Sequence, residues 1–301
     1  MRRLYTLYSE GGLQEVRRGI TDYHANHLRP RALYLTVASK IGPLLPSDSI
    51  WDQDWDVLCV LDGCRLDTFR EVADEDCDSL CSVGSTSQTW IPRTFDNYDT
   101  SEIAYITGNP FSTRTNTNEF GYYREIGVES INGVETVSPK KLTDCAIRAW
   151  RKRDDIGINQ LVIHYMQPHV PFRSRPEWFE EWEGDETWGS SIWEGIRTGK
   201  VSRDTLFDAY RDNLRWVWEE TGIARLRENC DAQIAVTADH GNAAGEWGFY
   251  GHPEGAPVPS VRHVPWVTLS GEDSKQMKPD LILEKDDDRD VEESLEALGY
   301  K

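Results

Sequence analysis

The segment Gln233-Ile-Ala-Val-Thr-Ala-Asp-His-Gly241 decides the fold class of this 301-residue chain. Its apolar residues 233–237 predict a buried strand, and a carboxylate and an imidazole, Asp239 and His240, follow at the carboxyl end of that strand. Open α/β sheets place their chemistry at this end of their strands. Because an aspartate oxygen and a histidine nitrogen suit a divalent cation, the segment predicts a metal centre at the edge of a sheet.

Other apolar runs of strand length surround this segment. The sequence predicts buried parallel strands over residues 57–61, 160–164, 233–237 and 265–269, with a fifth strand over 103–107. The patterns between these runs predict helices over residues 65–74, 141–153, 203–220 and 290–298. Strands that alternate with helices predict a doubly wound, mostly parallel α/β sheet flanked by helices.

The chain divides into two predicted parts. Residues 1–50 form a basic helical arm, because residues 1–46 hold seven basic and three acidic residues in a chain whose net charge is −19. Its apolar stretch 32–45 is too short to span a membrane, and it predicts either a peripheral membrane contact or a helix packed on the main domain. Residues 51–301 form the catalytic domain, with a Trp-rich helical insertion at about 174–200 that is either a lid or a packed cap.

The composition is acidic and poor in lysine. There are 52 Asp and Glu against 33 Lys and Arg, and only nine of the basic residues are lysine. Such a surface favours a halophilic protein over an ordinary acidic enzyme, because molar salt screens the repulsion between carboxylates. It argues against a nucleic-acid partner. The absence of a signal peptide, of an 18-residue apolar run and of a CxxC motif predicts a cytoplasmic protein.

Two further segments offer groups for chemistry near the first strand. Asp62 follows the strand over 57–61, so its carboxylate can face a bound cation, and Arg65 can orient Asp62, hold a substrate oxyanion or form a structural salt bridge. The cluster Ser85-Thr86-Ser87 follows a glycine. A metal-bound hydroxyl can act as a nucleophile, although the same composition is typical of a turn or a helix N-cap.

Histidines supply the remaining candidates. His169 follows the strand over 160–164 in a loop with two prolines, where it can contact a substrate oxyanion or donate a proton. His252 lies twelve residues after His240. His164 lies inside its strand and is expected to be a core residue.

These segments, in this order, resemble the alkaline phosphatase superfamily, on its sulfatase-like branch. The resemblance covers roughly residues 52–300 and is carried by Leu61-Asp-Gly-Cys-Arg65, His164-Tyr-Met-Gln-Pro-His169, Thr237-Ala-Asp-His-Gly241 and Gly251-His252. It implies that Asp62, Asp239, His240 and one hydroxyl of the cluster, Ser85 before Thr86 before Ser87, bind a divalent metal. It also implies that His169 and His252 flank the substrate ester.

The resemblance implies one metal rather than two, because Gln167 stands where relatives carry an acidic residue. A mostly oxygen ligand set favours Mn²⁺, Mg²⁺ or Ca²⁺, and the imidazole also allows Zn²⁺. The formylglycine motif of sulfatases is missing from the sequence.

The leading hypothesis is a metal-dependent hydrolase or transferase that acts on phosphate esters through a Ser or Thr nucleophile. Its substrate would be a small molecule or a glycan- or lipid-linked ester. One alternative is a sulfatase that lacks formylglycine. Another is a non-catalytic, sulfatase-like binding or structural module, which Gln167 and Trp247 suggest, because the resemblance implies an acidic residue at 167 and a histidine at 247.

Overall fold

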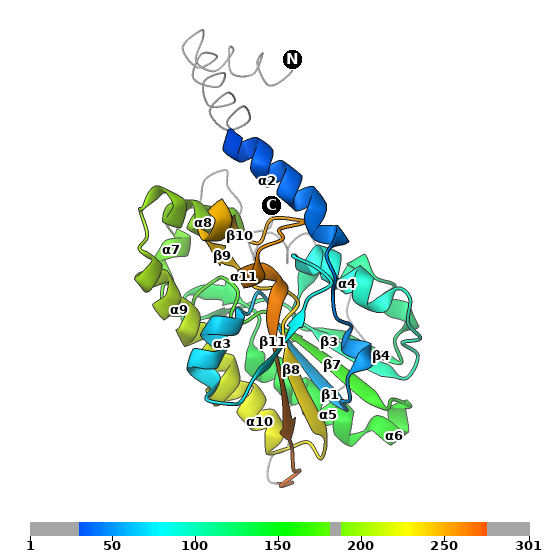
Figure 1. The fold of residues 1–301 in the computed structure, drawn as a ribbon. Coiled ribbons are helices and arrows are strands. Elements are labelled where there is room, and N and C mark those ends of the chain that lie inside the picture. The colour runs from blue at the N-terminus through cyan, green and yellow to red at the C-terminus, as the bar shows by residue number, and fades with distance from the viewer. Residues whose placement is uncertain (1–29, 181–187, 276–301) are drawn as a thin grey trace, which may run out of the picture.

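A seven-stranded sheet forms the centre of the protein, with helices on both of its faces (Figure 1). The computed structural model describes residues 30–180 and 188–275. The strand order is β2-β11-β8-β1-β7-β3-β4. The strands are β1 (Val57–Leu61), β2 (Asp78–Cys81), β3 (Ile103–Thr107), β4 (Tyr122–Glu125), β7 (Gln160–Tyr165), β8 (Gln233–Thr237) and β11 (His263–Ser270). The predicted doubly wound α/β class is confirmed.

Strand β1 runs through the middle of the sheet, parallel to β7 on one side and to β8 on the other. All five of its residues are fully buried. Cys59 points into a core that contains helices α3 (Leu66–Ala73) and α5 (Pro139–Arg151), whereas Val60 points to the opposite face, which α4 (Ser87–Phe95) covers. Burial on both faces explains why the strand is a continuous apolar run.

Strand β11 corrects one prediction, because it is antiparallel to both β8 and β2. Residues 265–269 were expected to form a parallel strand. After β8 the chain builds the loops of residues 238–262 and the short helix α11 (Pro259–Arg262), and then re-enters the sheet from the same edge. A strand that returns without a crossover must run in the opposite direction.

The helices agree with the apolar spacing of the sequence. The predicted helices over 65–74 and 141–153 are α3 and α5, and the one over 203–220 is α9 (Arg203–Arg215) continued by a π-helical turn (Trp216–Thr221). The predicted helix over 290–298 lies outside the described residues. The remaining α-helices are α2 (Pro30–Ile41), α6 (Arg153–Ile156), α7 (Glu177–Glu180), α8 (Trp188–Thr198) and α10 (Ile223–Arg227).

Short elements complete the architecture. The 3₁₀ turns are Gly42–Leu44, Ile50–Asp52, Pro110–Arg114, Thr117–Glu119 and Glu246–Gly248. Two small antiparallel ribbons are formed by β5 (Glu129–Ile131) with β6 (Val134–Thr136), and by β9 (Ala243–Ala244) with β10 (Tyr250–Gly251).

The Trp-rich segment contains α7 and α8 and packs over the loop that follows β7. Trp193 is buried in a cluster with Val170, Phe172 and Tyr210, and Trp178 packs against the same cluster. Trp182 lies outside the described residues. The two described tryptophan side chains therefore pack against the loop of His169.

Helix α2 rises from the body of the protein and contacts it mainly near its carboxyl end (Figure 1). Leu35 and Ala38 pack against an apolar cluster that contains Phe249 and Val258. Among the described residues, no helix is both long and apolar enough to cross a bilayer.

Candidate active site

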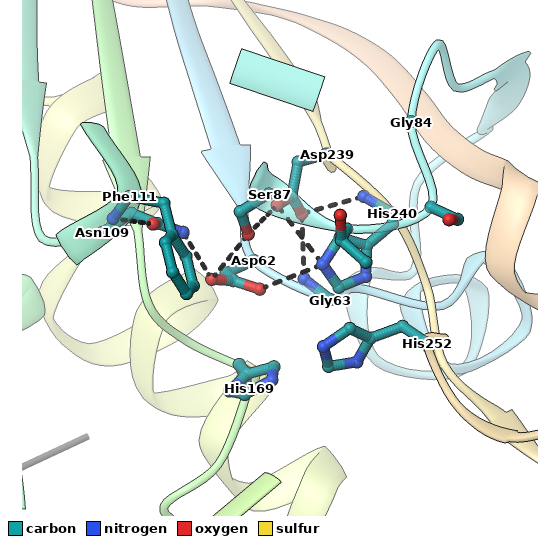
Figure 2. A network of polar contacts seen from close by, with 12 residues as sticks. Asp62, Gly63, Gly84, Ser87, Asn109, Phe111, His169, Asp239, His240 and His252 are labelled. Atoms are coloured by element: carbon teal, nitrogen blue, oxygen red, sulfur yellow. Dashed lines mark hydrogen bonds and ion pairs between the residues drawn. The ribbon is translucent and has the colours of Figure 1, made fainter. Parts of the chain in front are cut away.

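The candidate site lies at the carboxyl edge of the parallel strands, where several loops meet (Figure 2). Asp62 directly follows β1, and Asp239 lies two residues after the end of β8. Asn109 follows β3, and His169 lies in the loop after β7. Because neighbouring parallel strands end at the same edge, residues separated by more than a hundred positions in sequence become neighbours.

Two buried carboxylates form the centre of the site. Asp62 and Asp239 both have no solvent exposure. Oδ1 of Asp239 accepts hydrogen bonds from the backbone N–H groups of Gly63, at 3.0 Å, and His240, at 2.8 Å. Its Oδ2 therefore faces inward, where it accepts a 2.6 Å hydrogen bond from the Ser87 hydroxyl.

The carboxylate of Asp62 is only partly satisfied by its neighbours. Its Oδ2 accepts a 2.8 Å hydrogen bond from Asn109 Nδ2 and lies 3.4 Å from Ser87 Oγ. Its buried Oδ1 has no hydrogen-bond partner among the described residues. A buried carboxylate oxygen without a donor is costly unless a cation serves it.

The charges of the two carboxylates depend on each other. Burial, followed by the nearby charge of Asp239, raises the pKa of Asp62 well above its ordinary value. Burial also acts to raise the pKa of Asp239, but the neighbouring His240 and His164 outweigh it and lower that pKa below its usual range. Two adjacent buried carboxylates form a site that a divalent cation would stabilise.

His240 completes a ligand set around this position. Its Nδ1 lies 2.9 Å from the carbonyl oxygen of Gly241, which can only accept, so Nδ1 carries the hydrogen. The other ring nitrogen, Nε2, faces Asp62 Oδ1 at 3.6 Å and Asp239 Oδ2 at 3.5 Å, and it can offer a lone pair to a bound cation. Ligand atoms around a tetrahedral metal with bonds of about 2.0–2.1 Å lie roughly 3.3 Å apart. The spacing and the donor types therefore fit a divalent cation.

Two further histidines line the site beside His240. The ring centroids lie 4.4 Å apart for His240 and His252, and 5.2 Å apart for His169 and His252. Burial is the main cause that lowers the pKa of His169 to about 4 and the pKa of His252 well below its ordinary value, and the neighbouring imidazoles add to both shifts. Both rings are therefore neutral near pH 7.

The hydrogen bonds of these two rings fix their orientation. Asn242 donates from Nδ2 to the Gly63 carbonyl at 2.9 Å, so its Oδ1 accepts the Nδ1 hydrogen of His252 at 2.7 Å. His169 donates from Nδ1 to the carbonyl of Val170 at 2.9 Å. In each ring the lone pair is consequently on Nε2, the atom that can accept a proton or hold a substrate group.

His164 is the residue that sequence reasoning missed. It is fully buried, as expected for a core histidine, and its Nδ1 lies 3.1 Å from the Tyr105 hydroxyl. Its Nε2, however, lies 3.6 Å from Asp239 Oδ2, and one ligand atom each from Asp62, His164 and Asp239 lie within 4.8 Å of one another. The feature that could have identified His164 from the sequence is its position near the end of β7, where it lies in register with Val60 of β1.

The structure separates the three hydroxyls of the 85–87 cluster. Ser87 is the first residue of α4, and its hydroxyl faces the two carboxylates. Thr86 is the N-cap of that helix, and its Oγ1 accepts the Thr89 N–H. The order that placed Ser85 first needs correction, because Ser85 Oγ donates to the Pro253 carbonyl at 3.2 Å and accepts the Gly255 N–H at 2.8 Å. Ser85 thus holds the loop of His252.

Arg65 follows the structural interpretation rather than the substrate-binding one. Its guanidinium donates to Asp67 at 2.9 Å and to the carbonyl of Asn242 at 2.5 Å, and it lies 3.3 Å from Glu246. These bonds engage the guanidinium with Asp67, Asn242 and Glu246. Arg65 therefore supports the segment of Asn242, which in turn orients His252.

Comparisons with known proteins give distant similarities in fold. No protein-family model and no curated protein matches the chain. The C-terminal periplasmic domain of phosphoethanolamine transferase EptC from Campylobacter jejuni is similar at 16% identity and a TM-score of 0.44, over 71% of this chain and 78% of that chain. The soluble domain of lipooligosaccharide phosphoethanolamine transferase A from Neisseria meningitidis matches at 16% identity and a TM-score of 0.44, over 73% of this chain and 77% of that one.

A third similar structure is BT4656 in complex with its substrate D-glucosamine-2-N,6-O-disulfate. It matches at 12% identity and a TM-score of 0.40, over 72% of this chain and 71% of that chain. At such identities, the chemistry of this chain has to be judged from its own site residues.

Proposed function

We propose that this protein is a metal-dependent enzyme that transfers the phosphoryl group of a phosphate ester, with Ser87 as the nucleophile. One observation carries this function. The Ser87 hydroxyl lies 2.6 Å from Asp239 Oδ2 and 3.4 Å from Asp62 Oδ2, at the centre of the ligand set that fits a divalent cation. A hydroxyl that only capped a helix would not need two buried carboxylates beside it.

Ser87 is activated by its surroundings. Asp239 accepts the hydroxyl hydrogen and can hold it in place as the oxygen attacks. Asp62, Asp239 and His240, with His164 beside them, would hold the metal, which when bound acts as a Lewis acid and lowers the pKa of the hydroxyl. Ser87 also lies in the first turn of α4, where the helix N-terminus favours negative charge.

The reaction divides into two transfers. In the first, Ser87 Oγ forms a bond to phosphorus as its hydrogen passes to Asp239, the bond between phosphorus and the ester oxygen breaks, and the leaving oxygen takes up the hydrogen that Ser87 gave up. In the second, water or an acceptor alcohol takes the phosphoryl group and restores the serine. The choice of acceptor decides whether the protein is a hydrolase or a transferase.

His169 and His252 are placed to manage protons and charge in these steps. Both present a neutral Nε2 near pH 7, so in the second transfer each can accept a proton from the attacking water or alcohol and return it to Ser87 Oγ as that oxygen leaves phosphorus. Asn242 keeps the His252 ring in the required tautomer. Losing one group that stabilises transition-state charge typically lowers the rate by about 10²–10³-fold.

The test is turnover of p-nitrophenyl phosphate, bis-p-nitrophenyl phosphate and p-nitrophenyl sulfate in molar KCl, with Mn²⁺ added or removed by EDTA. Wild type is compared with Asp239→Asn and with a matched control, Asp144→Asn. Asp144 is also a buried carboxylate, but it lies on α5 and pairs with Lys140 at 2.7 Å and Arg225 at 2.6 Å.

We expect metal-dependent turnover of a phosphate ester by wild type and the Asp144→Asn control, and none by Asp239→Asn. Preferential turnover of the sulfate would instead establish a sulfatase that works without formylglycine. No turnover of any ester together with no bound metal would refute the enzyme and favour the non-catalytic module.

A further inference from the structure

Helix α2 carries an apolar face that the described part of the chain leaves uncovered. Six of the eight large hydrophobic side chains that are exposed in the described residues lie between positions 33 and 45. Four of them form one row along α2 and the turn after it, which we call the outer face: Leu33, Val37, Ile41 and Leu44, with exposed fractions of 66%, 48%, 49% and 81%.

The opposite side of α2 is already used for packing. Leu35 and Ala38 contact the body, and the carbonyl of Gly42 accepts a 2.8 Å hydrogen bond from Arg262 Nη1. Gly42 also approaches Gly255 so closely that a Cβ at position 42 would lie 2.0 Å from the Gly255 carbonyl oxygen. The helix is therefore anchored through one side, and the outer face is not the side that holds it to the body.

Charge indicates what covers the outer face. Residues 1–46 contain seven basic and three acidic residues, although the whole chain has a net charge of −19. Lys40 lies on the same helix and is exposed. An apolar row that shares its helix with an exposed lysine, in the basic part of the sequence, is complementary to a bilayer with anionic headgroups, into which aliphatic side chains insert individually.

A second copy of the chain fits the outer face less well. Stable protein interfaces bury roughly 800 Å² on each partner. One row of four partly exposed aliphatic side chains offers far less than this area. A bilayer needs no such area from a single rigid patch, because its binding energy comes from each inserted side chain together with electrostatic attraction.

We infer that the protein docks on an anionic membrane surface through the outer face of α2. A groove between α2 and the loop of residues 248–255 lies on the body side of the same helix. Leu35, Lys40, Phe249 and Pro253 line this groove, and His252 belongs to the same loop. The membrane contact itself is independent of the chemistry at Ser87.

The experiment measures binding of the full chain to vesicles of phosphatidylcholine, with and without phosphatidylglycerol, by flotation. The test variant is the triple substitution Leu33→Ser, Val37→Ser and Leu44→Ser. The matched control is Trp247→Ser, which removes an apolar side chain that is 58% exposed but lies outside α2. Circular dichroism melts verify folding, and the single substitution Leu44→Ser replaces the triple variant if the latter unfolds.

Wild type and Trp247→Ser are expected to bind the anionic vesicles, and the triple variant to bind at least about tenfold more weakly. Equal binding by the triple variant, or no binding of wild type to either vesicle, would overturn membrane docking. A wild-type dimer in light scattering that the triple variant converts to a monomer, without vesicle binding, would overturn it in favour of a second copy.

Discussion

Replacement of Ser87 by alanine, compared with the same replacement of Ser85, separates catalysis from stability. The two serines lie two positions apart, and each has 4% of its surface exposed. Ser87 Oγ donates to the carboxylate of Asp239 at 2.6 Å. Ser85 Oγ instead bonds two backbone groups of the loop after His252, at 3.2 and 2.8 Å. The pair therefore provides an internal control.

The two variants are expected to lose similar amounts of stability. Ser87→Ala removes one hydrogen bond to a charged group, which contributes about 1.5–3 kcal/mol. Ser85→Ala removes two neutral hydrogen bonds of about 1 kcal/mol each and leaves the Gly255 N–H without its acceptor. Both free energies of unfolding should therefore fall by about 2 kcal/mol.

Turnover, in contrast, should differ by orders of magnitude. Loss of a nucleophile lowers kcat by on the order of 10⁴–10⁶-fold. A shift of the His252 loop in Ser85→Ala should lower it by no more than about tenfold. The assay is metal-dependent turnover of the preferred phosphate ester, with denaturant unfolding of the same samples. Wild-type kcat in Ser87→Ala, or equal losses in the two variants at equal stability, would refute Ser87 as the nucleophile.

Three other predictions follow from charge. Burial and the charge of Asp239 raise the pKa of Asp62, so the metal-free protein loses stability as the pH rises through that pKa. Asp62→Asn should therefore stabilise the EDTA-treated protein by about 1–2 kcal/mol near pH 8, and it should weaken metal binding. Thermal melts with and without EDTA measure this gain, and its absence would show that the two carboxylates do not repel each other. Burial lowers the pKa of His169 from 6.5 to about 4, so about 3 kcal/mol of stability present above pH 6.5 should be lost as the pH falls to 4. In metal-free His169→Gln, the free energy of unfolding should not show this loss between pH 6.5 and pH 4. A pH profile of unfolding identical to that of wild type would show that His169 does not cause the loss. Finally, with a net charge of −19, the melting temperature should rise by several degrees between dilute buffer and molar KCl, whereas a flat response in thermal melts would argue against a halophilic protein.

The strands were predictable because their signal is local. Residues 57–61, 103–107 and 233–237 are continuous apolar runs, and the structure forms strands with these same limits. The direction of β11 was not predictable from its composition, because an apolar run has the same pattern whether it enters the sheet from one edge or the other.

The candidate site was predictable where a residue directly follows a strand. Asp62 and Asp239 could be expected to meet for this reason, and the structure brings them together with His240. Among three consecutive hydroxyls, however, the sequence alone did not show which one faces the two carboxylates. That choice depends on the residue at which α4 begins and on the direction in which its first turn points.

The sequence by itself determined the α/β class and the carboxylates and imidazoles that end the strands, because these depend on the order of residues within short segments. The tertiary structure alone decided that His164 lies beside Asp239, that Ser85 serves the His252 loop, and that Arg65 supports Asn242. Each of these contacts joins segments far apart in the chain. Strand register and loop packing set their distances, and neither is encoded in the periodicity of any one segment.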